Sequence, residues 1–364
     1  MKKTIKVTAL AAAAALMLGA CGSAPEEAAP TSGAEDSAKP GGDASAVKAC
    51  MVSDEGGFDD KSFNQSGFEG LQRAEKELGV EIKTAESNSD ADYDPNLNAM
   101  IQDGCTIIIG VGFKMADQID QKAQENPDVK FALVDSGFAS EPANGKALVF
   151  NTAEASYLAG YVSAGMSKGK IGTFVGMNIP TTAIFSDGFE DGMKKYNEDN
   201  GTNIELVGWD KAAQDGMATG DFSDVGKGQT FSKQQIEQGV DVIMPVAGPV
   251  GAGALAAAKD AGEGNVAIVW VDADGYETQP EYKEYILTSV VKEIGAAVFD
   301  SIKSVVDGNF TSDPYVGNLE NGGVSLAPFH DFDSKVPQEL KDAVNKVREQ
   351  IISGDIKVET VNQP

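Results

Sequence analysis

The sequence predicts an α/β protein with two lobes, each built around a doubly wound parallel sheet. From Val47 onward, short β-branched runs alternate with amphipathic stretches, which is typical of parallel sheets covered by helices. Ten such runs are too many for one compact sheet, so two sheets are expected. A single eight-stranded barrel is the alternative at this length. It is disfavoured because the strands outnumber its eight units and because two segments rich in turn-forming residues, 137–145 and 308–323, interrupt the pattern.

The predicted strands are apolar runs rich in Val and Ile, and the predicted helices carry apolar residues on one face. Strands are expected at residues 47–53, 80–84, 106–111, 130–135, 147–151, 170–175, 204–208, 240–245, 266–272 and 286–290. Helices are expected at residues 62–78, 95–102, 116–124, from 154 onward, and at 181–196, 223–238, 251–261, 294–306 and 338–352.

Composition and charge exclude several classes of function. The chain has 56 Asp and Glu residues against 29 Lys and Arg, a formal net charge of −27, which argues against binding to nucleic acid or to anionic lipid surfaces. Its one histidine, His330, excludes a metal site built from several histidines and disfavours catalysis by a His-containing triad. No CxxC, HExxH or GxSxG motif and no phosphate-binding loop occurs in the sequence. Composition leaves hydrolases and binding proteins both open. Because no nucleophile–base pair is legible in the sequence, a binding protein that is not an enzyme and has no cofactor is the expectation.

The N-terminus predicts export. Residues 1–21, MKKTIKVTALAAAAALMLGAC, combine a positive start with an apolar run too short to span a bilayer, as in a secretory signal. The ending LGAC resembles a bacterial lipobox, which implies cleavage after residue 20 and attachment of lipid, including palmitate, at Cys21. The alternative is an ordinary signal peptide with an incidental cysteine. Residues 21–46 have almost no large apolar side chains and are expected to form a flexible tether. The folded part would then lie at the extracytoplasmic face of the cell membrane.

Two further cysteines, Cys50 and Cys105, each lie near the start of a predicted strand. An exported protein experiences an oxidising environment, so a disulfide between them is expected if the strands are neighbours. Two buried thiols are the equally weighted alternative.

Polar or glycine residues follow the predicted strands where a doubly wound sheet binds ligands, outside its carboxyl ends. Carboxylates at such ends accept hydrogen bonds from hydroxyl groups, and glycines let backbone amides approach a ligand. Each acid alone is more simply a helix cap or turn former. Together they favour a neutral, polyhydroxylated ligand bearing a ring. The residues are Asp54, Gly112, Asp135, Gly248, Asp272, Asp274 and Lys292.

The stretch DEGGFDDKSFNQSGFEGL at 54–71 resembles a signature of the basic membrane protein (BMP) family, lipoprotein substrate-binding components of ABC transporters that include purine nucleoside receptors. Similar segments recur in order at residues 126–138, 153–180, 188–197, 221–229, 239–255, 287–300 and 321–329. The resemblance implies a type I periplasmic-binding-protein fold with three crossovers and a nucleoside, purine in particular, held between the lobes. It also implies ABC permease subunits as partners and a monomeric protein.

For the base, the resemblance implies that Asp54 and Asn64 form hydrogen bonds and that Phe63 stacks on one face. Phe222 would cover the opposite face. The stretch at 214–219, just before Phe222, resembles an insertion relative to the family. The resemblance therefore places Phe222 less directly than it places Phe63.

For the sugar, the resemblance implies that Asp135 and one acid of the Asp272-Ala273-Asp274 run accept from ribose hydroxyls. The Gly248 amide and Lys292 would assist. The family usually has Gln where this chain has Gly275, and Asp272 is favoured over Asp274 because it closes the strand.

The two expected lobes are lobe 1 at residues 47–152 and 273–318 and lobe 2 at residues 153–272 and 319–364.

Two alternatives to nucleoside capture remain at this point. The nearer is a binding protein for a sugar or an autoinducer, and the more distant is a nucleoside-processing enzyme, for which clustered carboxylates would serve as acid and base.

Overall fold

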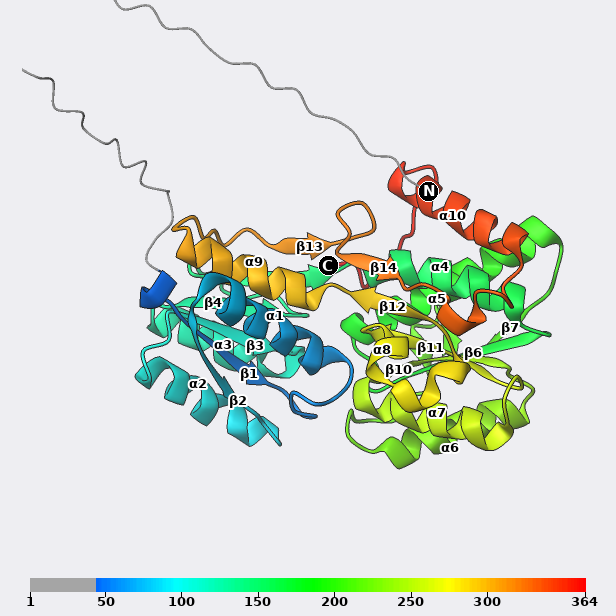
Figure 1. Ribbon diagram of the computed structural model, residues 1–364, viewed down its shortest axis with the longest axis horizontal. Helices are drawn as coiled ribbons and strands as arrows, with labels where there is room; N and C mark the ends of the chain where they lie inside the picture. Colours follow the sequence, from blue (N-terminus) through cyan, green and yellow to red (C-terminus); the bar gives the residue numbers. More distant parts are fainter. Residues whose placement is uncertain (1–43) are drawn as a thin grey trace, which may run out of the picture. The chain divides into compact units, whose positions relative to one another are not determined.

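The computed structural model describes residues 44–364, so the expectations for the signal segment, Cys21 and most of the tether lie outside the described residues. Two six-stranded sheets form the framework of this part, which confirms the predicted α/β class with two parallel-sheet cores (Figure 1). Within residues 44–364, none of the helices combines the length and hydropathy needed to cross a bilayer.

The first sheet has the strand order β13-β5-β4-β3-β1-β2, and all its pairs are parallel. Helices cover both faces, so side chains alternate between two cores along a strand. In β1, Ala49 and Met51 enter the core beneath α1 and α9, whereas Cys50 and Val52 enter the core beneath α2 and α3. The strands are β1 (Lys48–Ser53), β2 (Glu81–Ala85), β3 (Ile107–Val111), β4 (Lys130–Val134), β5 (Gly145–Phe150) and β13 (Tyr315–Gly317). The helices are α1 (Phe63–Leu78), α2 (Tyr93–Gln102), α3 (Ala116–Glu125) and α9 (Ile294–Val306).

The second sheet has the order β14-β12-β11-β10-β6-β7, with β14 antiparallel to β12 and the other pairs parallel. Its strands are β6 (Lys170–Val175), β7 (Glu205–Val207), β10 (Val242–Val246), β11 (Ala267–Asp272), β12 (Ile286–Lys292) and β14 (Val324–Leu326). The helices packed around it are α4 (Thr152–Met166), α5 (Pro180–Asn200), α6 (Val225–Glu237), α7 (Ala252–Ala261), the short α8 (Gly275–Thr278) and α10 (Gln338–Ile352). A small hairpin of β8 (Trp209–Asp210) and β9 (Asp215–Gly216) lies beside β6 and α5.

Three connections join the two lobes: β5 to α4, β12 to α9, and β13 to β14. Backbone hydrogen bonds tie the crossovers to one another, from the Asn151 N–H to the Gly317 carbonyl at 2.7 Å and from the Glu293 N–H to the Gly323 carbonyl at 3.0 Å. The three segments that cross between the lobes are therefore hydrogen-bonded to one another.

The predicted lobe boundary at residue 273 differs from the structure. Strand β12 pairs with β11 in the second sheet, so the chain returns to the first lobe only after Lys292. There α9 packs against α1, and the two helices lie side by side in Figure 1. The sequence of β12, ILTSVVK, is as apolar as strands of either sheet, and only its pairing shows where it belongs.

The start of α1 is held by a buried acid. Asp60 accepts hydrogen bonds from the backbone N–H groups of Ser62, Asn64 and Gln65 at 3.0, 2.8 and 3.0 Å. These groups have no partner within the helix, and a carboxylate there also interacts favourably with the helix dipole. Asp60 is thus a buried cap that positions the first turn of α1.

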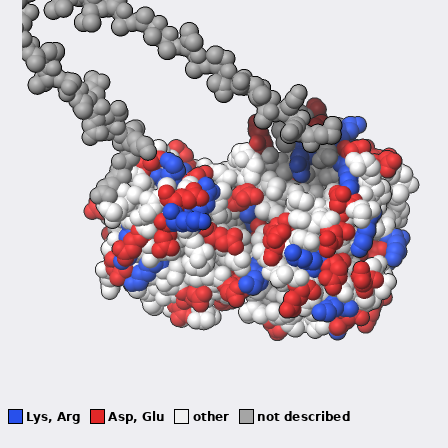
Figure 2. All heavy atoms as spheres, in the orientation of Figure 1, with Lys and Arg blue, Asp and Glu red and all other residues white. Residues whose placement is uncertain are grey.

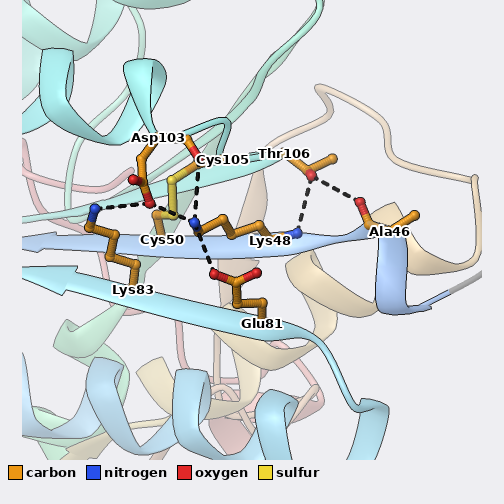
Figure 3. The surroundings of a disulfide bond; sticks show 8 residues. All are labelled: Ala46, Lys48, Cys50, Glu81, Lys83, Asp103, Cys105 and Thr106. Carbon is orange, nitrogen blue, oxygen red and sulfur yellow. Dashed lines mark hydrogen bonds and ion pairs between the residues drawn. A yellow bond between two sulfur atoms is a disulfide. The ribbon is translucent and has the colours of Figure 1, made fainter.

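Cys50 and Cys105 form a disulfide in this structure, with their Cα atoms 6.0 Å apart (Figure 3). Cys50 lies within β1 and Cys105 just before β3, and β1 and β3 are parallel neighbours. Of the two alternatives, bridged or free, the structure therefore supports the bridge. Ion pairs join the same strand ends, because Lys48 and Lys83 each contact Asp103, at 2.5 and 2.9 Å.

We expect the double substitution Cys50→Ala and Cys105→Ala to lower the free energy of unfolding by about 3–4 kcal/mol, because the bridge closes a loop across a separation of 55 residues. Urea unfolding of the oxidised proteins measures this difference. A thiol reductant should destabilise the wild type and leave the variant unchanged. Equal stability of the two oxidised proteins would contradict the prediction.

Candidate functional site

A buried group of three charged side chains lies where the two sheets meet. The Lys292 ammonium lies 2.6 Å from Asp135 Oδ2 and 3.0 Å from Asp272 Oδ1. The three residues are only 4%, 9% and 6% exposed, respectively. Burial by itself lowers the pKa of Lys292, but the two carboxylates outweigh it and raise the pKa above its ordinary value. Lys292 is therefore a charged group bonded to both acids.

The fold brings these residues together from three strand ends. Lys292 ends β12, Asp272 ends β11, and Asp135 directly follows β4 of the first sheet. Both acids adopt a left-handed backbone conformation, with φ of 61° at Asp135 and 69° at Asp272. Such conformations are unfavourable for most residues and tolerated by Asp, and they are concentrated at functional sites. The two lobes thus present equivalent strained carboxylates to the same lysine.

A second contact joins the lobes at the start of α1. The Ser62 hydroxyl lies 3.1 Å from both the Val271 carbonyl and Asp272 Oδ2. Asp272, in the second lobe, is therefore positioned by Ser62 of the first lobe.

The other end of the site holds a carboxyl and an amide. Asn64 donates from Nδ2 to Asp54 Oδ1 at 2.8 Å, and its own Oδ1 is buried without a hydrogen-bond partner in the part of the chain described. Burial raises the pKa of Asp54 to about 8. At neutral pH this carboxyl can therefore donate a hydrogen bond beside an amide oxygen that can accept one. An unpaired buried acceptor is unfavourable unless a partner reaches it, which makes Asn64 Oδ1 a candidate contact for a ligand N–H.

Aromatic rings border the space between these two ends. The Lys292 ammonium lies 4.7 Å from the centroid of the Phe63 ring. Phe222, from the second lobe, packs over the backbone of Gly176, where an added Cβ would come within 2.4 Å of its ring. Gly176 therefore allows this ring to lie close to the end of β6.

The charged group, the Asp54–Asn64 pair and the rings line one pocket. Gly248, which begins the short turn η4 (Gly248–Gly251) with φ of 51°, also borders it. The lining residues come from both lobes: Asp54, Glu55, Asp60, Phe63, Asn64, Gly112, Phe113, Asp135, Ile179, Thr181, Thr182, Phe185, Phe222, Val246, Ala247, Gly248, Pro249, Asp272 and Lys292. No group of three or more His, Cys, Asp or Glu residues within 44–364 is arranged to hold a metal ion.

Nine of the ten residues expected at a ligand site, Gly112 among them, line this pocket, and Asp274 does not. The carboxylate of Asp274 caps α8 by accepting from the Tyr276 N–H at 3.1 Å, and it lies 2.7 Å from His330 Nε2. Of the two acids left open by the sequence, Asp272 is therefore the one that faces the pocket.

One wall of the pocket was not predicted from the sequence. It is formed by Ile179, Thr181, Thr182 and Phe185, from the loop after β6 and the first turns of α5. The strand-end rule applies equally to the strand predicted at 170–175, and its use there would have found this loop. Asp60 and Glu55, which were also not predicted, line the pocket as well.

Charged side chains on the visible face are mixed, and Figure 2 shows acidic groups interspersed with basic ones and no extended basic patch.

Nearly all of the described chain is similar to known proteins. Residues 47–361 match the family model described as "ABC transporter substrate-binding protein PnrA-like". The chain is similar to the "ABC transporter nucleoside-binding protein BmpA" of Lactococcus lactis, 33% identical over 98% of this chain and 99% of that protein. It is also similar to "Basic membrane protein A" of Borreliella burgdorferi, 31% identical over 69% of this chain and 70% of that protein. A solved structure of a solute-binding protein of an ABC transporter system from Aeropyrum pernix superposes with a TM-score of 0.78 at 27% identity, over 85% of this chain and 92% of that one. Together with the two sheets, this confirms the type I periplasmic-binding-protein fold.

We expect Lys292→Met to lower the free energy of unfolding at pH 7 by about 3–5 kcal/mol, because it leaves two buried carboxylates without a cation. The raised pKa of Lys292 means that its stabilising charge is present throughout neutral pH and is lost only above that pKa. Burial raises the pKa of Asp135, and without Lys292 this acid would favour its protonated form further, so the loss of stability in the variant should shrink as pH falls from 7 towards 4. Urea unfolding at several pH values measures this, with Lys346→Met on the exposed face of α10 as control. A loss of unfolding free energy in Lys292→Met no larger than that in Lys346→Met would contradict the prediction.

Proposed function

The chain belongs to the family of PnrA-like ABC transporter substrate-binding proteins, and we propose that it captures nucleosides, purine nucleosides in particular, for uptake. Members of this family are solute receptors and not enzymes. The nucleoside would lie between the lobes, and permease subunits of an ABC transporter would receive it.

The observation that carries this proposal is the placement of paired acids at one end of an aromatic-bordered pocket. Asp135 and Asp272 lie on either side of Lys292, and two ionised carboxylates suit the two adjacent hydroxyls of ribose. Burial raises the pKa of Asp135 and the charge of Lys292 opposes that rise, and both carboxylates present oxygens beside the ammonium. A sugar alone would use these acids but not the rest of the pocket.

The remaining pocket suits a flat heterocycle. Phe63 and Phe222 supply apolar faces, and the ring edge would meet Asp54 and Asn64. A neutral Asp54 carboxyl donates while Asn64 Oδ1 accepts, a pattern that complements a base edge carrying one acceptor and one donor. The nucleoside-binding name of the Lactococcus relative supports the same ligand class.

We propose in addition that the protein is held at the extracytoplasmic face of the cell membrane by lipid on Cys21, as a monomer that delivers its ligand to membrane-embedded partners. The lipobox-like ending and the short apolar segment of the sequence support this. So does its similarity to an "Uncharacterized lipoprotein" of Pyrococcus abyssi, 31% identical over 85% of this chain and 79% of that protein.

The ligand class is tested by calorimetric titration of residues 47–364 with ribonucleosides, free bases and monosaccharides. We expect ribonucleosides to bind and to be recovered unchanged. Binding of monosaccharides without nucleosides would favour the sugar-receptor alternative, and recovery of free base and ribose would show an enzyme.

We expect Phe63→Ala to weaken nucleoside binding by about 1–3 kcal/mol, roughly 5- to 150-fold, because base–aromatic stacking is lost. Phe310→Ala is the matched control, since Phe310 is also partly buried but packs near Lys130, with the ammonium 5.7 Å from its ring centroid, outside the pocket. Titration of the folded proteins measures both affinities. Unchanged affinity in Phe63→Ala would show that this ring only packs the core.

A further inference from the structure

A second cavity adjoins the pocket beside the charged group. It shares Phe113, Asp135, Ile179, Thr181 and Lys292 with the pocket, so the same side chains border both spaces. Its volume is 290 Å³ against 60 Å³ for the pocket by the same measure. A ligand that fills the pocket therefore has room to extend past Asp135.

The side chains that wall the second cavity carry no charge beyond the Asp135–Lys292 pair. Its lining combines apolar side chains with neutral polar groups, namely Ser136, Gly137, Val149, Phe150, Thr152, Pro180, Ile184, Asn362, Gln363 and Pro364 besides the shared residues. The charged side chains that line it are Asp135 and Lys292, which are already paired with each other. A phosphate entering here would meet no unpaired cation and would lie beside a carboxylate.

One wall comes from the C-terminal segment and is firmly attached to the second lobe. Asn362 donates from Nδ2 to Asp187 Oδ2 at 2.9 Å and to Gln214 Oε1 at 2.6 Å. Asp187 is fully buried and also accepts from Trp209 Nε1 at 2.9 Å and from the Thr360 hydroxyl. Because this network fixes the segment, the cavity is a built feature of the fold.

The pocket determines which part of a ligand would reach this space. If Asp135 and Asp272 hold the two ring hydroxyls of ribose, the remaining substituent of the sugar is the one on its 5′ carbon. The cavity opens from Asp135 and Lys292 and does not include Asp54 or Asn64, so it adjoins the sugar end and not the base end.

We propose that the second cavity is a subsite for an uncharged substituent on the 5′ carbon of the nucleoside, and that it excludes a 5′-phosphate. This inference rests on the proposed nucleoside function. The ligands accepted would include 5′-thioether and 5′-alkyl nucleosides, whose apolar groups are buried against Phe150 and Ile184.

The test is calorimetric titration with three probes: the ribonucleoside of the panel that binds most tightly, its 5′-deoxy-5′-methylthio derivative and its 5′-monophosphate. We expect the methylthio derivative to bind at least as tightly as the parent and the monophosphate to bind at least about 100-fold more weakly.

A variant that narrows the cavity makes the test specific. Gly137 has open space for an added side chain, since no heavy atom lies within 4 Å of where its Cβ would be, and it lines the second cavity but not the pocket. Gly137→Leu should therefore weaken binding of the methylthio derivative by about tenfold relative to binding of the parent nucleoside. Ala139→Leu, an exposed change in the same loop, should leave the ratio of the two affinities as in the wild type.

The outcomes separate the two proposals. If the protein binds the parent nucleoside but not the methylthio derivative, the subsite proposal is wrong and the nucleoside function stands. The same conclusion follows if Gly137→Leu leaves the ratio of the two affinities unchanged. Binding of the monophosphate within tenfold of the parent overturns the exclusion of phosphate. Failure of every ribonucleoside to bind overturns the proposed function and this inference with it.

Discussion

The site depends on the ion pairs that Lys292 makes with Asp135 and Asp272. These acids belong to different lobes, so one ammonium joins the two sheets at the point where their strand ends meet. Two buried carboxylates without a cation are unfavourable, and the ammonium of Lys292 lies between them. Both acids have left-handed backbones and line one pocket. The ligand chemistry proposed above follows from that arrangement.

The same lysine also links the pocket to the crossovers. Lys292 ends β12, and the next residue, Glu293, begins the passage to α9 and donates its N–H to the Gly323 carbonyl at 3.0 Å. Burial raises the pKa of the Glu293 carboxyl, as expected in a closely packed connection. Rotation of one lobe against the other would alter the contact of Lys292 with Asp135 or Asp272. Lys292 is therefore the residue through which a ligand in the pocket would be coupled to the relative position of the lobes.

Much of the fold and of the pocket could be predicted because both follow from regular patterns. Alternating strands and helices indicate parallel sheets, and the strand-end rule finds Asp54, Asp135 and Asp272 without knowledge of their contacts. Pairing information is absent from such patterns, which is why the sequence places β12 in the wrong lobe. Asp274 follows the same strand as Asp272, yet it turns away to cap α8 and meet His330, a partner 56 residues distant. The anchoring of Asn362 by Asp187 spans 175 residues and has no local signal.

The most direct test of this account compares a ribonucleoside with its 2′,3′-dideoxy analogue by calorimetry on the wild type and on folded Asp135→Asn. Charge-assisted hydrogen bonds contribute about 1.5–3 kcal/mol each, so the wild type should prefer the ribonucleoside by at least about tenfold. Asp135→Asn should bind the ribonucleoside more weakly and show a smaller preference. Equal affinity of the wild type for both ligands would contradict the account, because the acids around Lys292 would then serve only to hold the lobes together.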